Sequence, residues 1–230
     1  MNPPTLTLGD TEVGRIGLGT NRLTETRENV AFIEKAVAAG VGLVDTAHLY
    51  TGGQSEATIG AALSPPPHGC IVATKGAFRP GEGRPEILRA QIEESLATIK
   101  EYRDDGKIAH VGVSEVGIDQ IERAREVVPI VAVQNHYNLS ERQHDEVVDY
   151  CAAEGLVFVP FFPLGGDGGA RLEEIADRHG ATPTQIALAW LLRRSPAMLP
   201  IPGTLSLAHL DENLAALEIE LSDAEYQALL

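Results

Sequence analysis

The sequence has few cysteines and few basic residues. Its two cysteines, Cys70 and Cys151, form no CxxC pair and no ligand cluster, so we expect two buried thiols rather than a disulfide or a metal site. Lysine and arginine number 18 against 33 acidic residues, and the formal charge of -15 repels phosphate backbones and anionic lipid headgroups. We therefore expect neither a nucleic-acid nor a membrane partner.

Long hydrophobic runs are also missing. Runs such as residues 155–164 are far shorter than a bilayer-spanning helix requires. Residues 1–4 show neither the basic start nor the apolar core of a secretion signal, so we expect a cytoplasmic protein. No linker, low-complexity tract or charge block divides residues 1–230, which we expect to form a single domain. The sequence does not indicate an oligomeric state.

Short β-rich segments alternate with helical ones along the chain. Residues 5–8 and 11–13 flank the turn dipeptide Gly9-Asp10 and predict an N-terminal β-hairpin. Seven later segments have the composition of strands, namely 16–19, 41–45, 70–75, 108–114, 130–136, 156–162 and 198–201. Apolar residues recur at helical spacing in most of the stretches between them. Capping sequences at residues 182–185 and 222–225 predict helix starts, the first opening a helix over 186–193.

Strands separated by crossover helices imply an α/β fold with a parallel sheet, either open and doubly wound or closed as a barrel. Two features favour the barrel. No GxGxxG sequence follows the first strand, as an open dinucleotide-binding sheet is expected to carry. Polar residues also stand at the carboxyl ends of several strands, which is where barrel enzymes hold their catalytic groups.

Three of these polar residues suggest a catalytic group. Asp45 ends one apolar strand, Lys75 ends the next, and Tyr50 lies on the loop that follows Asp45. A carboxylate and an ammonium at the ends of adjacent parallel strands can pair, and a Tyr hydroxyl beside the ammonium is a plausible general acid for a carbonyl oxygen. The alternative is a structural ion pair with a surface Tyr.

With these residues the chain resembles the aldo-keto reductases. The family motifs occur in order as Asp45-Thr46-Ala47, Ser55-Glu56, Gly112-Val113-Ser114, Gln134-Asn135-His136-Tyr137-Asn138, Pro163-Leu164-Gly165, Ile201-Pro202-Gly203-Thr204 and Glu212-Asn213. The resemblance covers almost the whole chain. It implies a (β/α)8 TIM barrel and NAD(P)H-dependent reduction of a small aldehyde or ketone, with Asp45, Tyr50 and Lys75 catalytic and Tyr50 as the general acid.

The resemblance also implies a nicotinamide cofactor, NADPH, with NADH not excluded. The residues implied to bind it are Thr20, Asp45, Ser114, Gln134, Phe161, Leu164, Gly165, Gly203, Thr204, Ser206, His209, Glu212 and Asn213. Gly203 and His209 stand where many members carry basic residues, and Glu115 stands where Asn is frequent. Phe161 is alternatively a core aromatic, and Glu212 and Asn213 are alternatively a helix cap.

Side-chain alternation gives a test that does not depend on the family. In a strand, residues two apart face the same side. Asp45, Lys75, Ser114, Gln134 and Phe161 are expected to point into the barrel, because the residues two positions earlier are small or apolar. These earlier residues are Leu43, Ala73, Gly112, Ala132 and Val159.

The largest departure from the family is a missing fourth strand. A helix expected over residues 85–100 is followed almost directly by the strand at 108–114, so about one βα unit, with the family's active-site His, is absent. Either the third and fifth strands pair directly, or the chain is a shortened version of a full-length enzyme. His110 is at the wrong end of its strand to replace that His, whereas His136 and His48 are better placed.

We therefore expect an incomplete barrel of the aldo-keto reductase type that reduces carbonyl compounds. The alternative is a catalytically impaired nicotinamide-cofactor-binding protein, and a third possibility is a chain that does not form a competent barrel. Leu49, Phe78 and Phe162 suggest an apolar mouth, but the sequence does not identify the carbonyl substrate.

Overall fold

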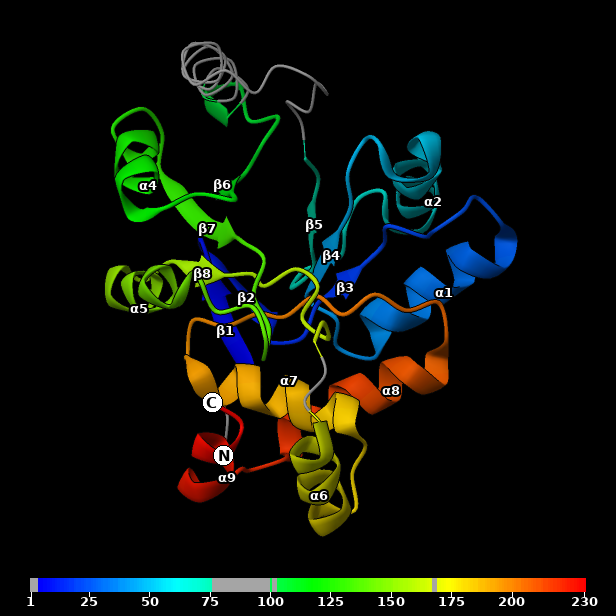
Figure 1. Ribbon diagram of the computed structural model, residues 1–230. Helices are drawn as coiled ribbons and strands as arrows, with labels where there is room; N and C mark the ends of the chain where they lie inside the picture. The colour runs from blue at the N-terminus through cyan, green and yellow to red at the C-terminus, as the bar shows by residue number, and fades with distance from the viewer. Residues whose placement is uncertain (1–3, 76–99, 101–102, 167–168) are drawn as a thin grey trace.

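The computed structural model describes residues 4–75, 100, 103–166 and 169–230 (Figure 1). The helices and strands in chain order are β1 (Thr5–Leu8), β2 (Thr11–Gly14), β3 (Leu18–Gly19), α1 (Arg27–Ala38), β4 (Leu43–Asp45), η1 (Tyr50–Gly53), α2 (Gln54–Leu63), β5 (Ile71–Ala73), β6 (Val111–Ser114), α4 (Ile118–Arg125), β7 (Ile130–Gln134), α5 (Asp145–Glu154), β8 (Val157–Phe158), α6 (Gly169–His179), α7 (Pro183–Arg194), α8 (Leu207–Ala215), η2 (Ala216–Glu218) and α9 (Asp223–Ala228). The described helices do not include one that is long and apolar enough to cross a membrane.

The expected N-terminal hairpin is confirmed. Strands β1 and β2 pair antiparallel, with Leu6 opposite Val13, and Gly9 in the turn has φ +65°. Because a side chain at that φ is strained, glycine suits the position. Leu8 and Val13 pack against apolar residues inside the barrel, so the hairpin covers the end of the barrel at which the strands begin.

Two parallel three-stranded sheets form most of the barrel wall, β3-β4-β5 and β6-β7-β8. The strands gather in the middle of Figure 1, and helices lie around them. The segment expected as a strand over 198–201 joins the two sheets. Met198 makes a parallel bridge to Phe158, and Gly203, two residues beyond the expected strand, makes another to Gly19, so the wall is continuous from β5 through β3 and β8 to β6.

Prolines explain why this joining segment has only isolated bridges. Pro200 and Pro202 accept hydrogen bonds from the N–H groups of Gly17 and Gly19, at 2.9 and 3.3 Å. Proline has no N–H to donate in return, so a regular ladder cannot form. The prediction of a seventh strand at 198–201 is therefore right about its place in the wall and wrong about its regularity.

The other strands are shorter than expected but stand where expected. Parts of the predicted strands lie outside the observed ones, namely residues 16–17, 41–42, 70, 74–75, 108–110, 135–136, 156 and 159–162. Some still pair singly, since the Phe161 N–H donates to the Asn135 carbonyl at 3.2 Å. The capped helices are confirmed, because Thr182 with Gln185 and Ser222 with Glu225 both form capping boxes.

In the described residues the wall is not continuous between β5 and β6. Among the described residues no ladder or bridge joins these two strands, which stand apart in Figure 1. Direct pairing of the third and fifth strands, one of the two alternatives from the sequence, is therefore not seen in this part of the chain. The helix expected over 85–100 lies, apart from Lys100, outside the described residues.

The alternation predicted for the strands is confirmed by the core. Leu43, Ala73, Ala132 and Val159 belong to one apolar cluster inside the barrel. A second and larger cluster surrounds Trp190 of α7 on the outside of the sheet. Cys70 and Cys151 are buried, as expected, at 8% and 0% exposure.

Candidate active site

The carboxyl ends of the strands open onto one cavity of about 1030 Å3. A barrel concentrates the residues that follow its strands at one end. The expected residues that line this cavity are Thr20, Asp45, Tyr50, Lys75, Ser114, Gln134, Phe161, Leu164, Gly165 and Gly203. The structure thus brings together ten residues predicted from distant parts of the sequence.

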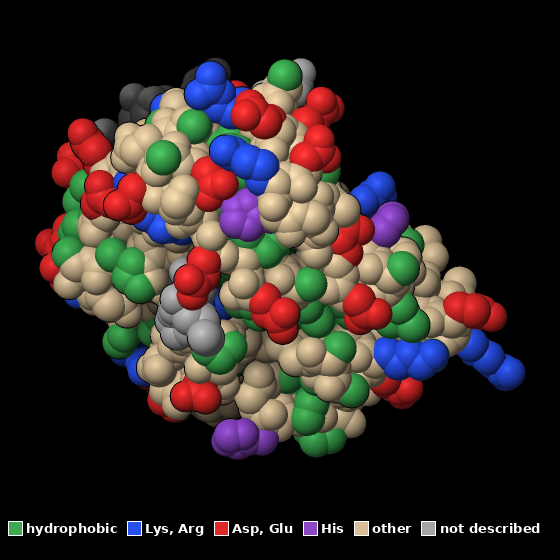
Figure 2. Space-filling view, turned by 90° about the horizontal axis from the view of Figure 1, so that it is seen from below, with side chains coloured by type: hydrophobic (Ala, Val, Ile, Leu, Met, Phe, Trp, Pro, Cys, Tyr) green, Lys and Arg blue, Asp and Glu red, His purple; other side chains and the backbone are tan. Residues whose placement is uncertain are grey.

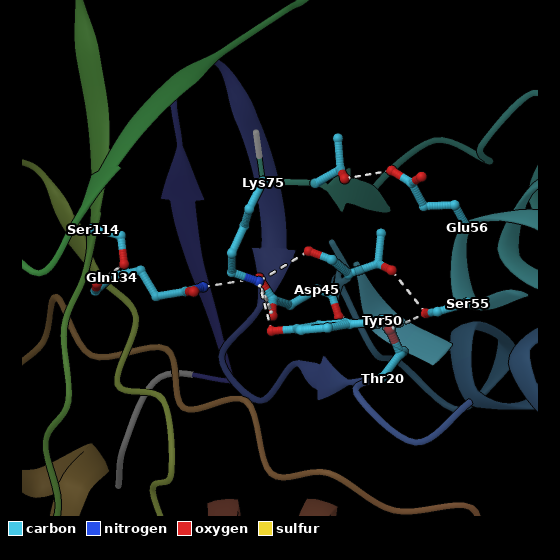
Figure 3. Close-up of polar contacts among 10 residues, drawn as sticks. Thr20, Asp45, Tyr50, Ser55, Glu56, Lys75, Ser114 and Gln134 are labelled. Carbon is cyan, nitrogen blue, oxygen red and sulfur yellow. Dashed lines mark hydrogen bonds and ion pairs between the residues drawn. The ribbon is translucent and has the colours of Figure 1, made fainter. Parts of the chain in front are cut away.

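Lys75 occupies the centre of the polar group (Figure 3). Its Nζ donates to Asp45 Oδ2 at 2.6 Å, to the Thr46 carbonyl at 2.9 Å and to the Tyr50 hydroxyl at 3.3 Å. An ammonium has three N–H groups, and these three acceptors match them. The ammonium is therefore held beside the Tyr50 oxygen, where it favours development of negative charge.

Asp45 is the most buried of the three residues Asp45, Tyr50 and Lys75, with 3% of its surface exposed. Burial raises the pKa of its carboxyl group, while the Lys75 charge and hydrogen bonds from Lys75 and Gln134 oppose that rise. The Gln134 Nε2 donates to Asp45 Oδ1 at 2.8 Å. Both oxygens of a buried carboxylate are therefore paired, which reduces the cost of its burial.

A network of buried hydroxyl groups supports the loop that carries Tyr50. Ser55 Oγ lies 2.7 Å from the hydroxyl oxygens of both Thr20 and Thr46. Thr20 also donates to the Asp45 carbonyl at 2.8 Å. These bonds join the ends of β3 and β4 to the start of α2, which explains the Thr46 and Ser55 motif in structural terms.

The part of the cavity lining beyond the Lys75 group comes from β6, from β7 and from the segments after β7 and β8. Its residues are Ser114, Gln134, His136 and Phe161. Ser114 Oγ donates to the Gln134 carbonyl at 2.7 Å, and the His136 and Phe161 rings stack with centroids 5.3 Å apart. Glu115, beside Ser114, has φ +55° and accepts the His136 N–H at 2.6 Å. A non-glycine residue at such a φ is uncommon, and residues of this kind are enriched at functional sites.

Five of the expected cofactor residues, Thr204, Ser206, His209, Glu212 and Asn213, do not line the cavity. They precede or belong to α8, where the Ser206 hydroxyl accepts the His209 N–H and caps the helix. Glu212 Oε1 accepts the Thr182 hydroxyl at 2.5 Å, so this carboxylate links α8 to the start of α7. Their role in binding a cofactor stays a prediction.

The three candidate histidines occupy different places. His110 lies at the hairpin end of the barrel, 3.0 Å from Asp10, as expected for the wrong end of its strand. His48 pairs with Glu56 at 3.1 Å, and 81% of its side chain is exposed. Of the two better-placed candidates only His136 lines the cavity.

The sequence analysis missed some lining residues. They are Asn21, Arg22, Ser140 and Glu141. Arg22 follows Thr20 by two residues at the carboxyl end of the first barrel strand, so its position was the available signal. In the lining as described, Arg22 joins Lys75 as a second basic residue. The described residues contain no group of three side chains suited to hold a metal ion.

Comparison with known proteins identifies the aldo/keto reductase family, which agrees with the resemblance seen in the sequence. The model of the aldo/keto reductase family matches residues 15–100 and 91–229. Pyridoxine 4-dehydrogenase of Escherichia coli is 34% identical over 274 residues, which cover 97% of this chain and 96% of that protein. Because that alignment is longer than the 230 residues of this chain, the relative has residues without a counterpart here.

Solved structures agree in fold. A thermostable aldo-keto reductase, crystallised with the inhibitor epalrestat, is 30% identical with a TM-score of 0.83, and the match covers 98% of each chain. An aldo/keto reductase from Klebsiella pneumoniae, crystallised with NADP and acetate, has a TM-score of 0.82 at 24% identity, covering 98% of this chain and 94% of that one. The latter supports the barrel fold alone.

Proposed function

The chain belongs to the aldo/keto reductase family, and from this premise we propose that it reduces an aldehyde or ketone with NADPH, with Tyr50 as the proton donor. The observation that carries the proposal is the contact of Lys75 with Tyr50 at 3.3 Å and with Asp45 at 2.6 Å. An alkoxide forms when a carbonyl carbon accepts a hydride, and a nearby hydroxyl group must then give up a proton.

The cavity fits a nicotinamide cofactor. Its volume of about 1030 Å3 is at the upper end of typical ligand pockets. Glycine allows close packing on the lining, since a Cβ at Gly166 would come 2.1 Å from the Ser140 Oγ. Ser114 and Gln134 would hold the carboxamide, Phe161 would face the ring, and Arg22 would offset phosphate charge. When bound, NADPH would supply the hydride.

Within this scheme the residues of the chain have separate tasks. Tyr50 holds the proton that the product oxygen receives. Lys75 stabilises the tyrosinate that remains, and Asp45 holds the Lys75 ammonium in place. The product is an alcohol.

We also propose that the substrate is apolar and uncharged. Leu49 and Phe162 on the cavity lining are 61% and 60% exposed, and Leu164 is 39% exposed. Exposed apolar side chains at a pocket mouth mark a surface for an apolar ligand. Glu115 and Glu141 on the same lining would repel a carboxylate. Acidic side chains are also spread over the face seen in Figure 2.

A further part of the proposal is that the barrel lacks one βα unit together with the family's His. Two observations support it: among the described residues no ladder or bridge joins β5 to β6, and the alignment with the E. coli relative is longer than this chain. Asp45, Tyr50 and Lys75 do not belong to that unit. Loss of the unit would therefore slow the reduction without changing the type of reaction.

Two matched aldehydes test the proposal. Purified protein with NADPH should reduce para-methylbenzaldehyde with a higher kcat/KM than para-carboxybenzaldehyde, which differs mainly in charge. Consumption of NADPH without either aldehyde is the blank. If NADPH binds but neither aldehyde is reduced, the protein is a cofactor-binding protein instead of a reductase. If the carboxylate is preferred, the apolar substrate class is wrong.

A further inference from the structure

The hydrogen bond between Gln134 and Asp45 joins the two halves of the barrel wall. Asp45 ends β4 in the first three-stranded sheet, whereas Gln134 ends β7 in the second. Figure 3 shows the Gln134 side chain reaching toward Asp45 from the side on which Ser114 lies, while Lys75 approaches from another direction. Residues 89 positions apart therefore share one carboxylate, at a Nε2 to Oδ1 distance of 2.8 Å.

The two oxygens of Asp45 have different partners. Oδ2 accepts from Lys75 at 2.6 Å, and Oδ1 accepts from Gln134 at 2.8 Å. The contact of Lys75 with Tyr50, at 3.3 Å, is the longest of its three bonds. A rotation of the carboxylate would therefore first alter how closely the ammonium approaches the Tyr50 hydroxyl.

We propose that Gln134 is a positioning residue for the proton donor: its N–H fixes Asp45 so that only Oδ2 faces Lys75, and the ammonium stays beside Tyr50. The proposal rests on the proposed function in so far as it concerns the reaction. An amide carries a donor and an acceptor on different atoms. One Gln134 side chain is thus able to hold Asp45 through Nε2 and a nicotinamide carboxamide through Oε1.

Loss of the amide has a definite electrostatic consequence. Without the Gln134 N–H, Asp45 Oδ1 is a buried oxygen with one partner fewer, and the pKa of the carboxyl group rises further above its usual value. While Asp45 stays ionised, removal of the positive end of the amide dipole makes the potential at Tyr50 more negative. The Tyr50 hydroxyl is then a poorer proton donor to the product oxygen.

Other charged groups face the same cavity. Arg22, Glu115, His136 and Glu141 line it and belong to loops after β3, β6 and β7. In the described part of the chain, the hydrogen bonds to the Asp45 carboxylate come from Lys75 and Gln134. A substitution at Gln134 does not change these four charged groups. They therefore contribute equally to the electrostatic potential at the site in the parent and in the variants.

Two variants and one control test the proposal. Gln134→Leu removes the amide, and Gln134→Asn keeps a polar amide that is one methylene too short. Thr74→Val is the control, because Thr74 donates to Glu56 at 2.6 Å near the same loops and does not line the cavity. Single-turnover reduction of para-methylbenzaldehyde at saturating NADPH separates the chemical step from cofactor affinity.

We expect both Gln134 variants to react about tenfold more slowly, and the alkaline limb of their pH profile to move up by about half a pH unit or more. In the free protein, 13C NMR of the Asp45 carboxyl group should show a higher titration midpoint in Gln134→Leu. Thr74→Val should match the parent in all three measurements. If turnover is slower but neither the alkaline limb of the pH profile nor the Asp45 titration midpoint changes, Gln134 has a merely structural role and the proposal is overturned.

The NMR arm separates this proposal from the proposed function. If the parent reduces no aldehyde but Gln134→Leu raises the Asp45 midpoint, the proposed function fails while the control of Asp45 by Gln134 stands. If the midpoint in both Gln134 variants equals that of the parent, the positioning proposal fails whatever the protein reduces.

Discussion

The Lys75 ammonium lies 5.0 Å from the centre of the Tyr50 ring and 3.3 Å from its hydroxyl oxygen. The cation therefore contacts both the face of the ring and the group at its edge. Attraction between a cation and an aromatic face does not require the hydroxyl. This geometry allows the proton donor to be removed while the ring and Lys75 keep their positions.

Tyr50→Phe should abolish carbonyl reduction and leave the dissociation constant of NADPH nearly unchanged. The substitution removes the proton donor, and the ring keeps its contact with Lys75. Fluorescence titration with NADPH and turnover of para-methylbenzaldehyde measure the two effects separately. A variant that reduces the aldehyde at the parent rate would show that Tyr50 is not the acid.

Arg22→Gln should weaken NADPH binding by about tenfold, the size expected for loss of one charge-assisted hydrogen bond. Arg22 lines the cavity of a protein whose formal charge is -15, so phosphates depend on the few cations near the site. Arg125→Gln is the matched control, since Arg125 pairs with Glu122 and Glu154 away from the cavity. Equal affinities for the two variants would contradict the assignment of Arg22.

Arg15→Met should destabilise the fold by about 2–4 kcal/mol. Arg15 is 1% exposed, and its guanidinium donates to the carbonyls of Leu192, Ser195 and Met198 at 2.8 to 3.3 Å. The apolar side chain would leave these buried acceptors unpaired. Urea unfolding measures the loss. Arg123→Met, at an exposed position of α4, should change stability by less than about 0.5 kcal/mol, and a similar loss in both would contradict the explanation.

Glu225→Gln should destabilise the protein at neutral pH and lose this effect in acid. The Ser222 N–H, followed by the Ser222 hydroxyl and His179, lowers the pKa of Glu225 to about 2 from its usual value of 4.5. A lowered pKa gives stability that is present above pH 4.5 and is lost as the pH falls toward about 2.

The expected difference in the free energy of unfolding between the parent and Glu225→Gln at neutral pH is about 1 kcal/mol, which is typical of a helix cap. Unfolding midpoints of parent and variant at pH values on both sides of this window provide the measurement. Glu173→Gln, which changes an exposed carboxylate of α6, should show no such window. A constant difference between parent and Glu225→Gln down to the lowest pH would exclude the carboxylate as its source.

Local sequence signals predicted the elements and the central group of the site. These signals depend on neighbouring residues, which is why the sequence shows them. They are the turn at Gly9, the capping boxes at Thr182 and Ser222, the end of β4 at Asp45 and the position of Lys75 just after β5. The irregular joining segment was mispredicted because composition indicates a strand without showing which backbone groups find partners.

The contacts that the sequence did not reveal all join distant segments. The bond from Gln134 to Asp45 depends on the register of two separate sheets, and the bonds from Arg15 depend on how α7 packs. Glu212 was expected at a cofactor, but its contact with Thr182 follows from the packing of α8 against α7. Side-chain alternation predicted the direction of Gln134 without identifying its partner.

The last prediction concerns the addition of a βα unit between β5 and β6. Strands β5 and β6 are not joined to each other in the described structure, and a parallel barrel normally pairs every strand on both sides. Each buried polar group left unpaired costs about 1–3 kcal/mol, while a domain is stable by only about 5–15 kcal/mol. A strand inserted between them would satisfy several such groups.

We therefore expect that a version of the chain with a βα unit inserted between residues 100 and 102, carrying a His at the end of its strand, has a higher unfolding midpoint and faster carbonyl reduction. The same insertion with Ala in place of the His is the control. It should raise the midpoint equally but increase turnover less, because the strand completes the wall and the His orients the carbonyl. If the unmodified chain already equals both versions in midpoint and turnover, the wall is complete without a fourth strand and another group does the work of the His.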